Sequence, residues 1–144
     1  MKLRRMFKDD GAQSLVEFAF ILPIILLIIT GLFDVARAVW QENTLAYAAR
    51  EGTRYAIVHG SGYPDPALVA WPNNTVQITQ VVRNAAVGVP NITVTSTWSD
   101  GCYDRNCRVS VTATAPFVPL PSAYMLGGAF QITLKGGSEL VIQR

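Results

Sequence analysis

Residues 18–33 are FAFILPIILLIITGLF, a stretch of sixteen residues in which no side chain is charged. Leu15 and Val16 extend it towards the N-terminus, around the single acid Glu17. A helix from Leu15 to Phe33 would be roughly 28 Å long, which is close to the ~30 Å hydrocarbon core of a bilayer. The sequence therefore predicts a transmembrane segment at about residues 15–33.

The charges around this segment predict its orientation. Four basic residues precede it: Lys2, Arg4, Arg5 and Lys8. Arg37 is the only basic residue in the fifteen positions after Phe33. The positive-inside rule therefore predicts a cytoplasmic leader at residues 1–11 and an exported C-terminal part.

The leader also holds the whole net charge of +2, because the rest of the chain has eight basic and eight acidic residues. No basic surface is left to attract a polyanion, so we expect no nucleic acid as a partner.

The composition argues against an enzyme. Of the 144 residues, 50% are hydrophobic and only 15% are charged, which argues against a disordered chain. A single histidine, His59, and two cysteines leave too few ligands for a His-rich or four-thiolate metal site. No acid pair, nucleophile–base set or phosphate-binding glycine loop occurs. We therefore expect no catalytic residues, no metal and no cofactor.

Three fates are compatible with the apolar segment. It can be a plain signal anchor, or a secretory signal cleaved after the small-x-small triplet Ala36-Arg37-Ala38. The run is longer than a usual signal core of about 7–15 residues, and Asp34 lies in the supposed cleavage region, which disfavours that second fate. The third fate is cleavage after a short basic leader that ends at Gly11 or Ala12, with the helix retained.

Four blocks in fixed order support the third fate, and they lie within residues 11–58: Ser14–Ala19, Leu22-Pro23, Gly31–Arg37 and Ala48–Ala56. The leader resembles the class III signal of type IV pilin-like proteins, in which a prepilin peptidase cuts before the apolar segment. More closely, the blocks resemble the TadE-like family of minor pseudopilins from tight-adherence (Flp) pilus systems.

The resemblance implies a structural or assembly component of a type IV (Tad/Flp) pilus, anchored in the cytoplasmic (inner) membrane or present in the pilus. Its implied partners are other pilins and pseudopilins, a prepilin peptidase, the inner-membrane assembly platform and the lipid bilayer. The alternative is a membrane-anchored binding module unrelated to pili, with four aromatic contact residues: Trp71, Trp98, Tyr103 and Tyr124. Such aromatics serve more often in packing.

Two residues of the helix have implied assembly roles. In pilins the functional acid is usually fifth after the cut, and cleavage after Ala12 makes Glu17 fifth, whereas cleavage after Gly11 makes it sixth. Glu17 would pair with the new α-amino group of a neighbouring subunit; the alternative is that it rests at the headgroup level. Pro23 predicts a bend, which a stretching filament could also use.

We expect one helix from about Ser14 to His59, within a helical part at 12–59, because no proline occurs between Ile24 and Tyr63. Asp34 with Arg37, and Glu51 with Arg54, suit an exposed face. The opposite, apolar side consists of Val35, Ala38, Val39, Leu45, Ala46, Ala49 and Ala56. His59 would interact with the C-terminal end of the helix dipole.

The exported part, residues 60–144, predicts a small β-rich domain. A short helix is expected at 75–86, followed by strands at 92–98 and 109–114 joined through 99–106. A second hairpin is expected from strands at 130–134 and 139–142, with 135–138 as its turn. The predicted fold class is α+β and pilin-like: a long N-terminal helix, half transmembrane and half exported, packed on a small antiparallel sheet with one short extra helix.

The two cysteines, Cys102 and Cys107, have four residues between them and lie in or at the end of the loop that joins the first two strands. They lie on the side predicted to face an oxidising compartment, so we expect them to form a structural disulfide. A thioredoxin-type site would need two intervening residues, and a zinc site would need further ligands.

Overall fold

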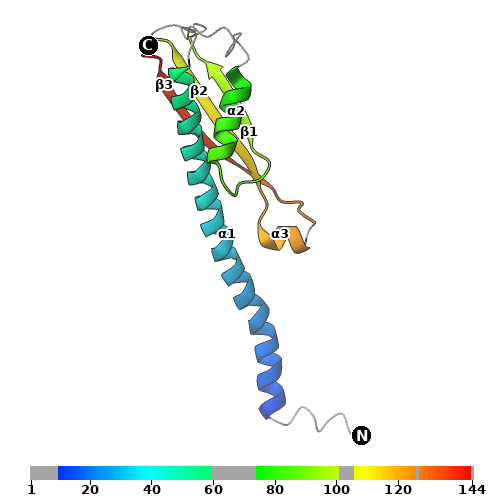
Figure 1. The fold of residues 1–144 in the computed structure, drawn as a ribbon. Coiled ribbons are helices and arrows are strands. Elements are labelled where there is room, and N and C mark those ends of the chain that lie inside the picture. The colour runs from blue at the N-terminus through cyan, green and yellow to red at the C-terminus, as the bar shows by residue number, and fades with distance from the viewer. Residues whose placement is uncertain (1–9, 60–73, 101–105, 126, 144) are drawn as a thin grey trace. The chain divides into compact units, whose positions relative to one another are not determined.

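The computed structural model describes residues 10–59, 74–100, 106–125 and 127–143 (Figure 1). The elements follow in the order α1 (Asp10–Val58), α2 (Asn74–Ala85), β1 (Thr93–Trp98), β2 (Arg108–Phe117), α3 (Leu120–Met125) and β3 (Ile132–Val141). A long N-terminal helix with a small antiparallel sheet is the predicted α+β class. The chain divides into two compact units, and each is described in turn.

The first unit joins the chain up to Ala36 with Pro119–Phe130. Its main element is the N-terminal part of α1, and this helix continues through Pro23. Its second element is α3, which the sequence did not predict. The backbone N–H of Gly128 donates to the carbonyl of Ser122 (2.9 Å), so the chain after α3 folds back on that helix.

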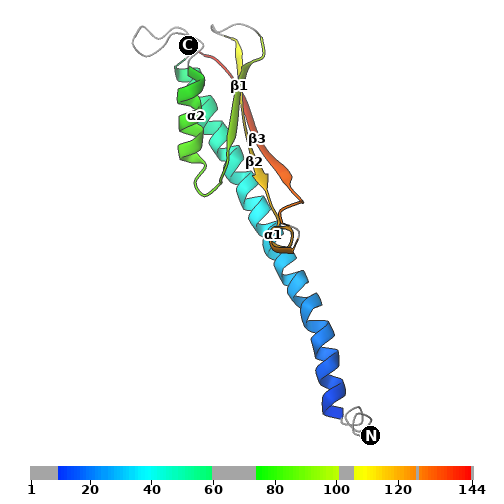
Figure 2. The ribbon, with the colours of Figure 1, turned by 90° about the vertical axis from the view of Figure 1, so that its right-hand side faces the viewer.

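The second unit consists of Arg37–Val118 and Gln131–Arg144. Its three strands form an antiparallel sheet in the order β1-β2-β3. The second part of α1 and the shorter α2 lie on one side of this sheet (Figure 2). Alternate residues of β2 are buried towards the helices, as the period of two predicts: Val109, Val111, Ala113, Ala115 and Phe117.

Small residues line the face of α1 that this sheet covers: Ala48, Ala49, Gly52, Thr53 and Ala56 are all buried. A Cβ on Gly52 would clash with a methyl group of Val82 and would lie 3.2 Å from Val111. Thr53 has no exposed surface, and its hydroxyl donates to the carbonyl of Ala49 (2.8 Å) and lies 3.3 Å from that of Ser138. Close approach of helix and sheet therefore depends on these small side chains.

The first predicted hairpin is confirmed. β1 and β2 pair antiparallel, with Thr93 opposite Thr114 and Trp98 opposite Val109. The second strand is longer than expected, because it continues to Phe117 and pairs over its whole length with β3.

The second predicted hairpin is wrong. Residues 135–138 form no turn; they lie inside the single strand β3, where Gly136 is opposite Ala113 and Gly137 opposite Thr112. Gly136 is buried, and a Cβ there would clash with the backbone of α1 at Leu45 and Ala46. The glycine is needed for this close approach, not for a turn conformation.

The prediction of an exposed face and a packed face on α1 is right at some positions and wrong at others. Arg54 and Glu51 form an exposed ion pair (2.9 Å), as predicted. Asp34 is only 7% exposed, whereas Val35 and Val39, both expected on the packed side, are 62% and 53% exposed. The backbone N–H of Leu120, at the start of α3, donates a hydrogen bond to Asp34, and no local sequence pattern predicts that contact.

Candidate functional site

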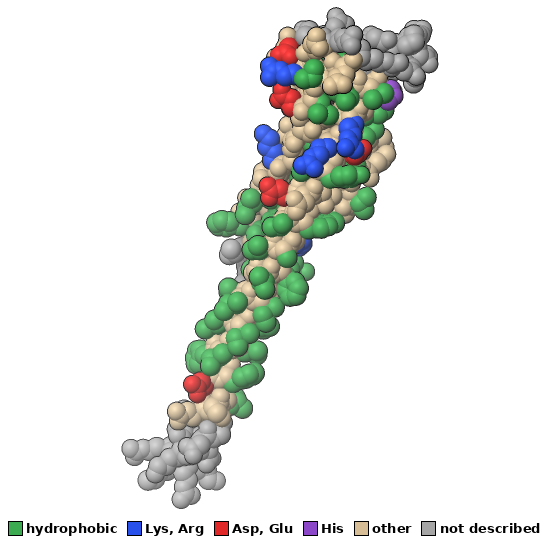
Figure 3. All heavy atoms as spheres, turned by 90° about the vertical axis from the view of Figure 1, so that its left-hand side faces the viewer, with side chains coloured by type: hydrophobic (Ala, Val, Ile, Leu, Met, Phe, Trp, Pro, Cys, Tyr) green, Lys and Arg blue, Asp and Glu red, His purple; other side chains and the backbone are tan. Residues whose placement is uncertain are grey.

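The apolar part of α1 is uncovered. The stretch of α1 that qualifies by length and composition as a candidate membrane span has none of its residues buried by the rest of the chain. Its large side chains are exposed by between 40% for Leu22 and 74% for Phe20. Figure 3 shows hydrophobic side chains over the visible face of this part of the helix. Water is a poor solvent for such a surface, which makes this stretch a candidate membrane span.

Glu17 lies near the N-terminal end of this surface, and its side chain is exposed. A carboxylate in this position is accessible to a group on another molecule. The predicted cleavage positions, Gly11 and Ala12, lie in the first turn of α1, which begins at Asp10. The roles predicted for Gly11, Ala12, Glu17 and Pro23 stay predictions.

One polar side chain inside the apolar stretch satisfies its own hydrogen-bonding need. The hydroxyl of Thr30 lies 2.9 Å from the carbonyl of Leu26 and 3.1 Å from that of Leu27, one turn earlier in the helix. This back-bonding lets a hydroxyl face hydrocarbon without an external partner.

Asp34 follows the apolar stretch directly and binds the start of α3. Its Oδ2 accepts a hydrogen bond of 2.8 Å from the backbone N–H of Leu120, the first residue of that helix. The first N–H groups of a helix have no partner within it, and α3 has no acidic residue in its own first turn. A carboxylate distant in sequence therefore acts as its N-cap.

Arg37 fixes the end of β2 within the second unit. Its guanidinium donates to the carbonyl of Val118 (2.5 Å) and stands 4.7 Å from the centre of the Phe117 ring. Hydrogen bonding and a cation–π contact together hold the chain where β2 ends. Sequence reasoning quoted both Asp34 and Arg37 in the Gly31–Arg37 block but missed these roles.

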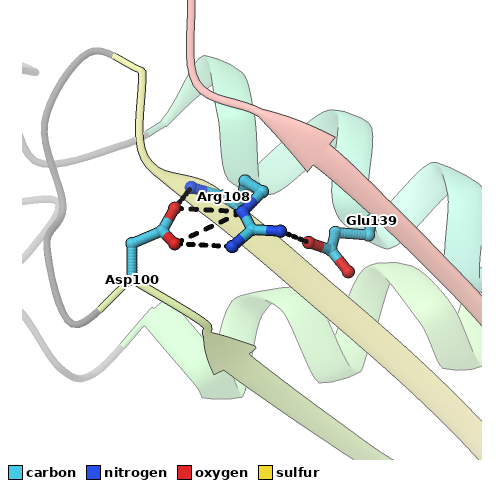
Figure 4. A network of polar contacts seen from close by, with 3 residues as sticks. All are labelled: Asp100, Arg108 and Glu139. Atoms are coloured by element: carbon cyan, nitrogen blue, oxygen red, sulfur yellow. Dashed lines mark hydrogen bonds and ion pairs between the residues drawn. The ribbon is translucent and has the colours of Figure 1, made fainter.

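A polar network lies where the connection from β1 enters β2 (Figure 4). The carboxylate of Asp100 accepts from the backbone N–H of Arg108 (2.9 Å) and from its guanidinium (2.8 Å). The same guanidinium lies 3.4 Å from the carboxylate of Glu139 on β3. The hydrogen bond from the Arg108 guanidinium holds the pKa of Asp100 below the ordinary aspartate range, and the hydrogen bond to Asp100 in turn raises the pKa of Arg108. The network links the ends of all three strands.

The cysteine prediction falls partly outside the described residues. Cys107 is buried just before β2, and the described part of the chain has no free cysteine. Cys102 lies outside the described residues, so the Cys102–Cys107 disulfide stays a prediction.

His59 lies just past the end of α1. Its Nδ1 is 3.0 Å from the carbonyl of Tyr55, and its ring stacks on the Tyr55 ring with centroids 4.0 Å apart. It thus lies against a carbonyl at the C-terminal end of the helix, where the dipole favours a cation. Within residues 10–59, 74–100, 106–125 and 127–143, no group of three or more His, Cys, Asp or Glu residues could hold a metal ion.

The four aromatic residues considered as binding contacts are not equivalent. Trp98 packs against the hydrophobic core, whereas Tyr124 on α3 is 85% exposed. Trp71 and Tyr103 lie outside the described residues. The structure therefore leaves Tyr124 as the clearest exposed aromatic of the set.

Comparison with known proteins gives one finding. The family model described as TadE-like protein matches residues 12–54, which contain the apolar stretch, Asp34 and Arg37. No curated protein matches the chain, and no solved structure does. Residues 12–54 are therefore similar to the TadE-like family, the same family that the four sequence blocks resemble.

Proposed function

We propose that this chain is a minor pseudopilin of a Tad (Flp) type IV pilus, held in the cytoplasmic membrane by α1 until it enters or primes the pilus. The proposal is carried by one observation: an apolar helix with no residue of its span buried by the chain itself. The TadE-like match over residues 12–54 supports association with a Tad pilus.

The same uncovered surface serves two environments in this proposal. In the membrane, lipid tails cover the apolar side chains of α1. In a pilus, the α1 helices of neighbouring subunits replace the lipid, because both surroundings are equally apolar. Moving α1 from lipid into the pilus therefore costs little hydrophobic free energy. Polar groups would decide the axial register between subunits and the choice of partner.

Glu17 is the polar group that would decide register. A prepilin peptidase that cuts after Gly11 or Ala12 creates an α-amino group a few residues before Glu17. In a bundle of apolar helices, this ammonium group of one subunit and the Glu17 carboxylate of the next would offset each other's loss of hydration. The exported part of the chain would then project from the bundle.

The experiment replaces Glu17 with Gln in the full chain. Glu17→Gln should still enter the membrane and be cleaved, because the change removes only a charge. It should associate poorly with other pilus subunits, since breaking a buried ion pair costs about 3–5 kcal/mol. Membrane level, N-terminal processing and co-purification with pilus subunits are measured together.

Glu42→Gln is the matched control, because Glu42 is an exposed acid of α1 beyond the apolar stretch. This variant should co-purify like the wild type. Equal co-purification of Glu17→Gln, with normal pili, would reject the ion-pair mechanism.

A further inference from the structure

The segment Pro119–Phe130 begins beside the end of the apolar stretch of α1. The stretch ends at Phe33, and the next residue, Asp34, accepts the hydrogen bond from the N–H of Leu120 (2.8 Å). Because one short bond joins them, the start of α3 lies at the depth at which α1 would leave the hydrocarbon. The bond lies within one compact unit of the chain.

The chemistry of this segment is unusual for an exposed part of a protein. Its sequence, PLPSAYMLGGAF, contains no charged residue in twelve positions. Tyr124 is 85% exposed and Phe130 is 68% exposed. Two large aromatic side chains therefore stand in contact with solvent in a segment whose start is bonded to Asp34 at the end of the apolar stretch. No charge within the segment would oppose their transfer out of water.

The exposed aromatics are held in place by the backbone around them. The side-chain Oγ of Ser122, a residue that is 6% exposed, accepts from the N–H of Phe130 (3.0 Å), and the Ser122 carbonyl accepts from Gly128. Gly127 and Gly128 both have positive φ, which lets the chain turn back there. Tyr124 and Phe130 thus protrude from a hydrogen-bonded structure.

We propose that Pro119–Phe130 is a membrane-contact segment, with Tyr124 and Phe130 immersed at the headgroup boundary of the leaflet where α1 leaves the bilayer. Tyrosine is enriched at this boundary, because its ring is apolar and its hydroxyl can bind water or headgroups. The Asp34 carboxylate, which would be costly near hydrocarbon without a partner, already accepts a hydrogen bond there. This inference rests on the proposed anchoring of α1 in a membrane.

The test places the photo-crosslinking residue p-benzoylphenylalanine at Tyr124 or Phe130 of the full chain in phosphatidylcholine–phosphatidylglycerol nanodiscs. Two positions of α1 serve as references: Phe20 within the apolar stretch, and Tyr47, which is 55% exposed and about 21 Å farther along the helix than Phe33. After irradiation, lipid adducts are quantified by mass spectrometry. We expect lipid adducts at Phe20, Tyr124 and Phe130. At Tyr47 we expect no more adduct than in the unirradiated sample.

The outcomes separate this inference from the proposed anchoring. Adducts at Phe20, with Tyr124 and Phe130 no higher than Tyr47, would overturn membrane contact by the segment and leave the anchor intact. No adduct at Phe20 would overturn the anchor itself. Protein–protein adducts at Tyr124 or Phe130 in place of lipid adducts would show that another subunit covers this surface, which also overturns the inference.

A second measurement needs no substitution. Wild-type protein is irradiated in nanodiscs that contain a phospholipid with a photoreactive group near the start of its acyl chain. Labelled peptides from Pro119–Phe130 support the inference, and labelling confined to α1 contradicts it.

Discussion

Gly136 sets how closely β3 approaches α1, and it tests the packing at single-residue scale. A Cβ at this position would meet the helix backbone at Leu45 and Ala46, which cannot rotate away as a side chain can. Gly136→Ala should therefore lower the free energy of unfolding by about 1–3 kcal/mol or more, measured by denaturant unfolding of the full chain in micelles.

The neighbouring glycine provides the control for that measurement. A Cβ on Gly137 would meet only the Thr112 hydroxyl, at an ordinary contact distance of 3.8 Å. Gly137→Ala should change the free energy of unfolding by less than about 0.5 kcal/mol. Equal losses from the two substitutions would contradict the close approach of Gly136 to α1.

The interaction of Asp100 with Arg108 should make the stability of the folded state depend on pH. Hydrogen bonds from Arg108 hold its pKa below the ordinary aspartate range, so the folded state favours the ionised carboxylate. The contribution of this interaction is present above the unfolded-state pKa and is lost as the pH falls through the lower folded-state pKa. An NMR titration should place the Asp100 midpoint below that of an unstructured aspartate.

Arg108→Gln should raise the titration midpoint of Asp100 towards that of an unstructured aspartate, because the substitution removes the positive charge and the guanidinium donors. Glu139→Gln should shift it less, since Glu139 contacts only the far side of the guanidinium. An unchanged Asp100 midpoint in Arg108→Gln would contradict the assigned cause.

The helix α3 depends on a cap supplied from elsewhere in the chain. Asp34→Ala removes the acceptor for the N–H of Leu120, and loss of a helix N-cap typically costs about 0.5–2 kcal/mol. We expect faster hydrogen exchange at the Leu120 amide in the variant than in the wild type, measured by mass spectrometry on peptides that cover α3.

Asp34→Asn is the conservative control, because an asparagine oxygen caps a helix about as well as a carboxylate does. Its Leu120 amide should exchange at nearly the wild-type rate. If Asp34→Ala also leaves the exchange rate unchanged, the cap does not hold α3.

The elements differ in how far local sequence determines them. The extent of α1 follows from its residues, since no proline lies between Ile24 and Tyr63, and the first hairpin follows from alternation of apolar residues with threonine and serine. By contrast, Lys135-Gly136-Gly137-Ser138 has the composition of a turn. Its extended conformation follows from pairing with β2 and from the close approach of Gly136 to α1, both of which are contacts distant in sequence. For α3, two prolines and a distant cap leave no local helix signal.

At the scale of the whole molecule, α1 changes character along its length. Ile, Leu and Phe dominate before Asp34, where the helix surface is exposed, and Ala, Gly and Thr line the buried face after Gln41, where the sheet packs. The exposed apolar stretch could be predicted from the sequence, because length and charge alone mark a candidate span. The role of Glu17 stays a prediction. The roles of Asp34 and Arg37 could not, because their partners lie more than eighty positions away in the chain.

The central claim is that this chain is processed like a pilin and keeps α1 as its membrane anchor. The position at which the mature protein begins, measured by mass spectrometry, tests this claim most directly. The protein is isolated from membranes after carbonate washing, and the intact mass and N-terminal peptide are measured. The account predicts a membrane-embedded protein that starts at Ala12 or Gln13. A soluble protein that starts at Val39 or nearby, or a membrane protein that keeps Met1, would contradict it.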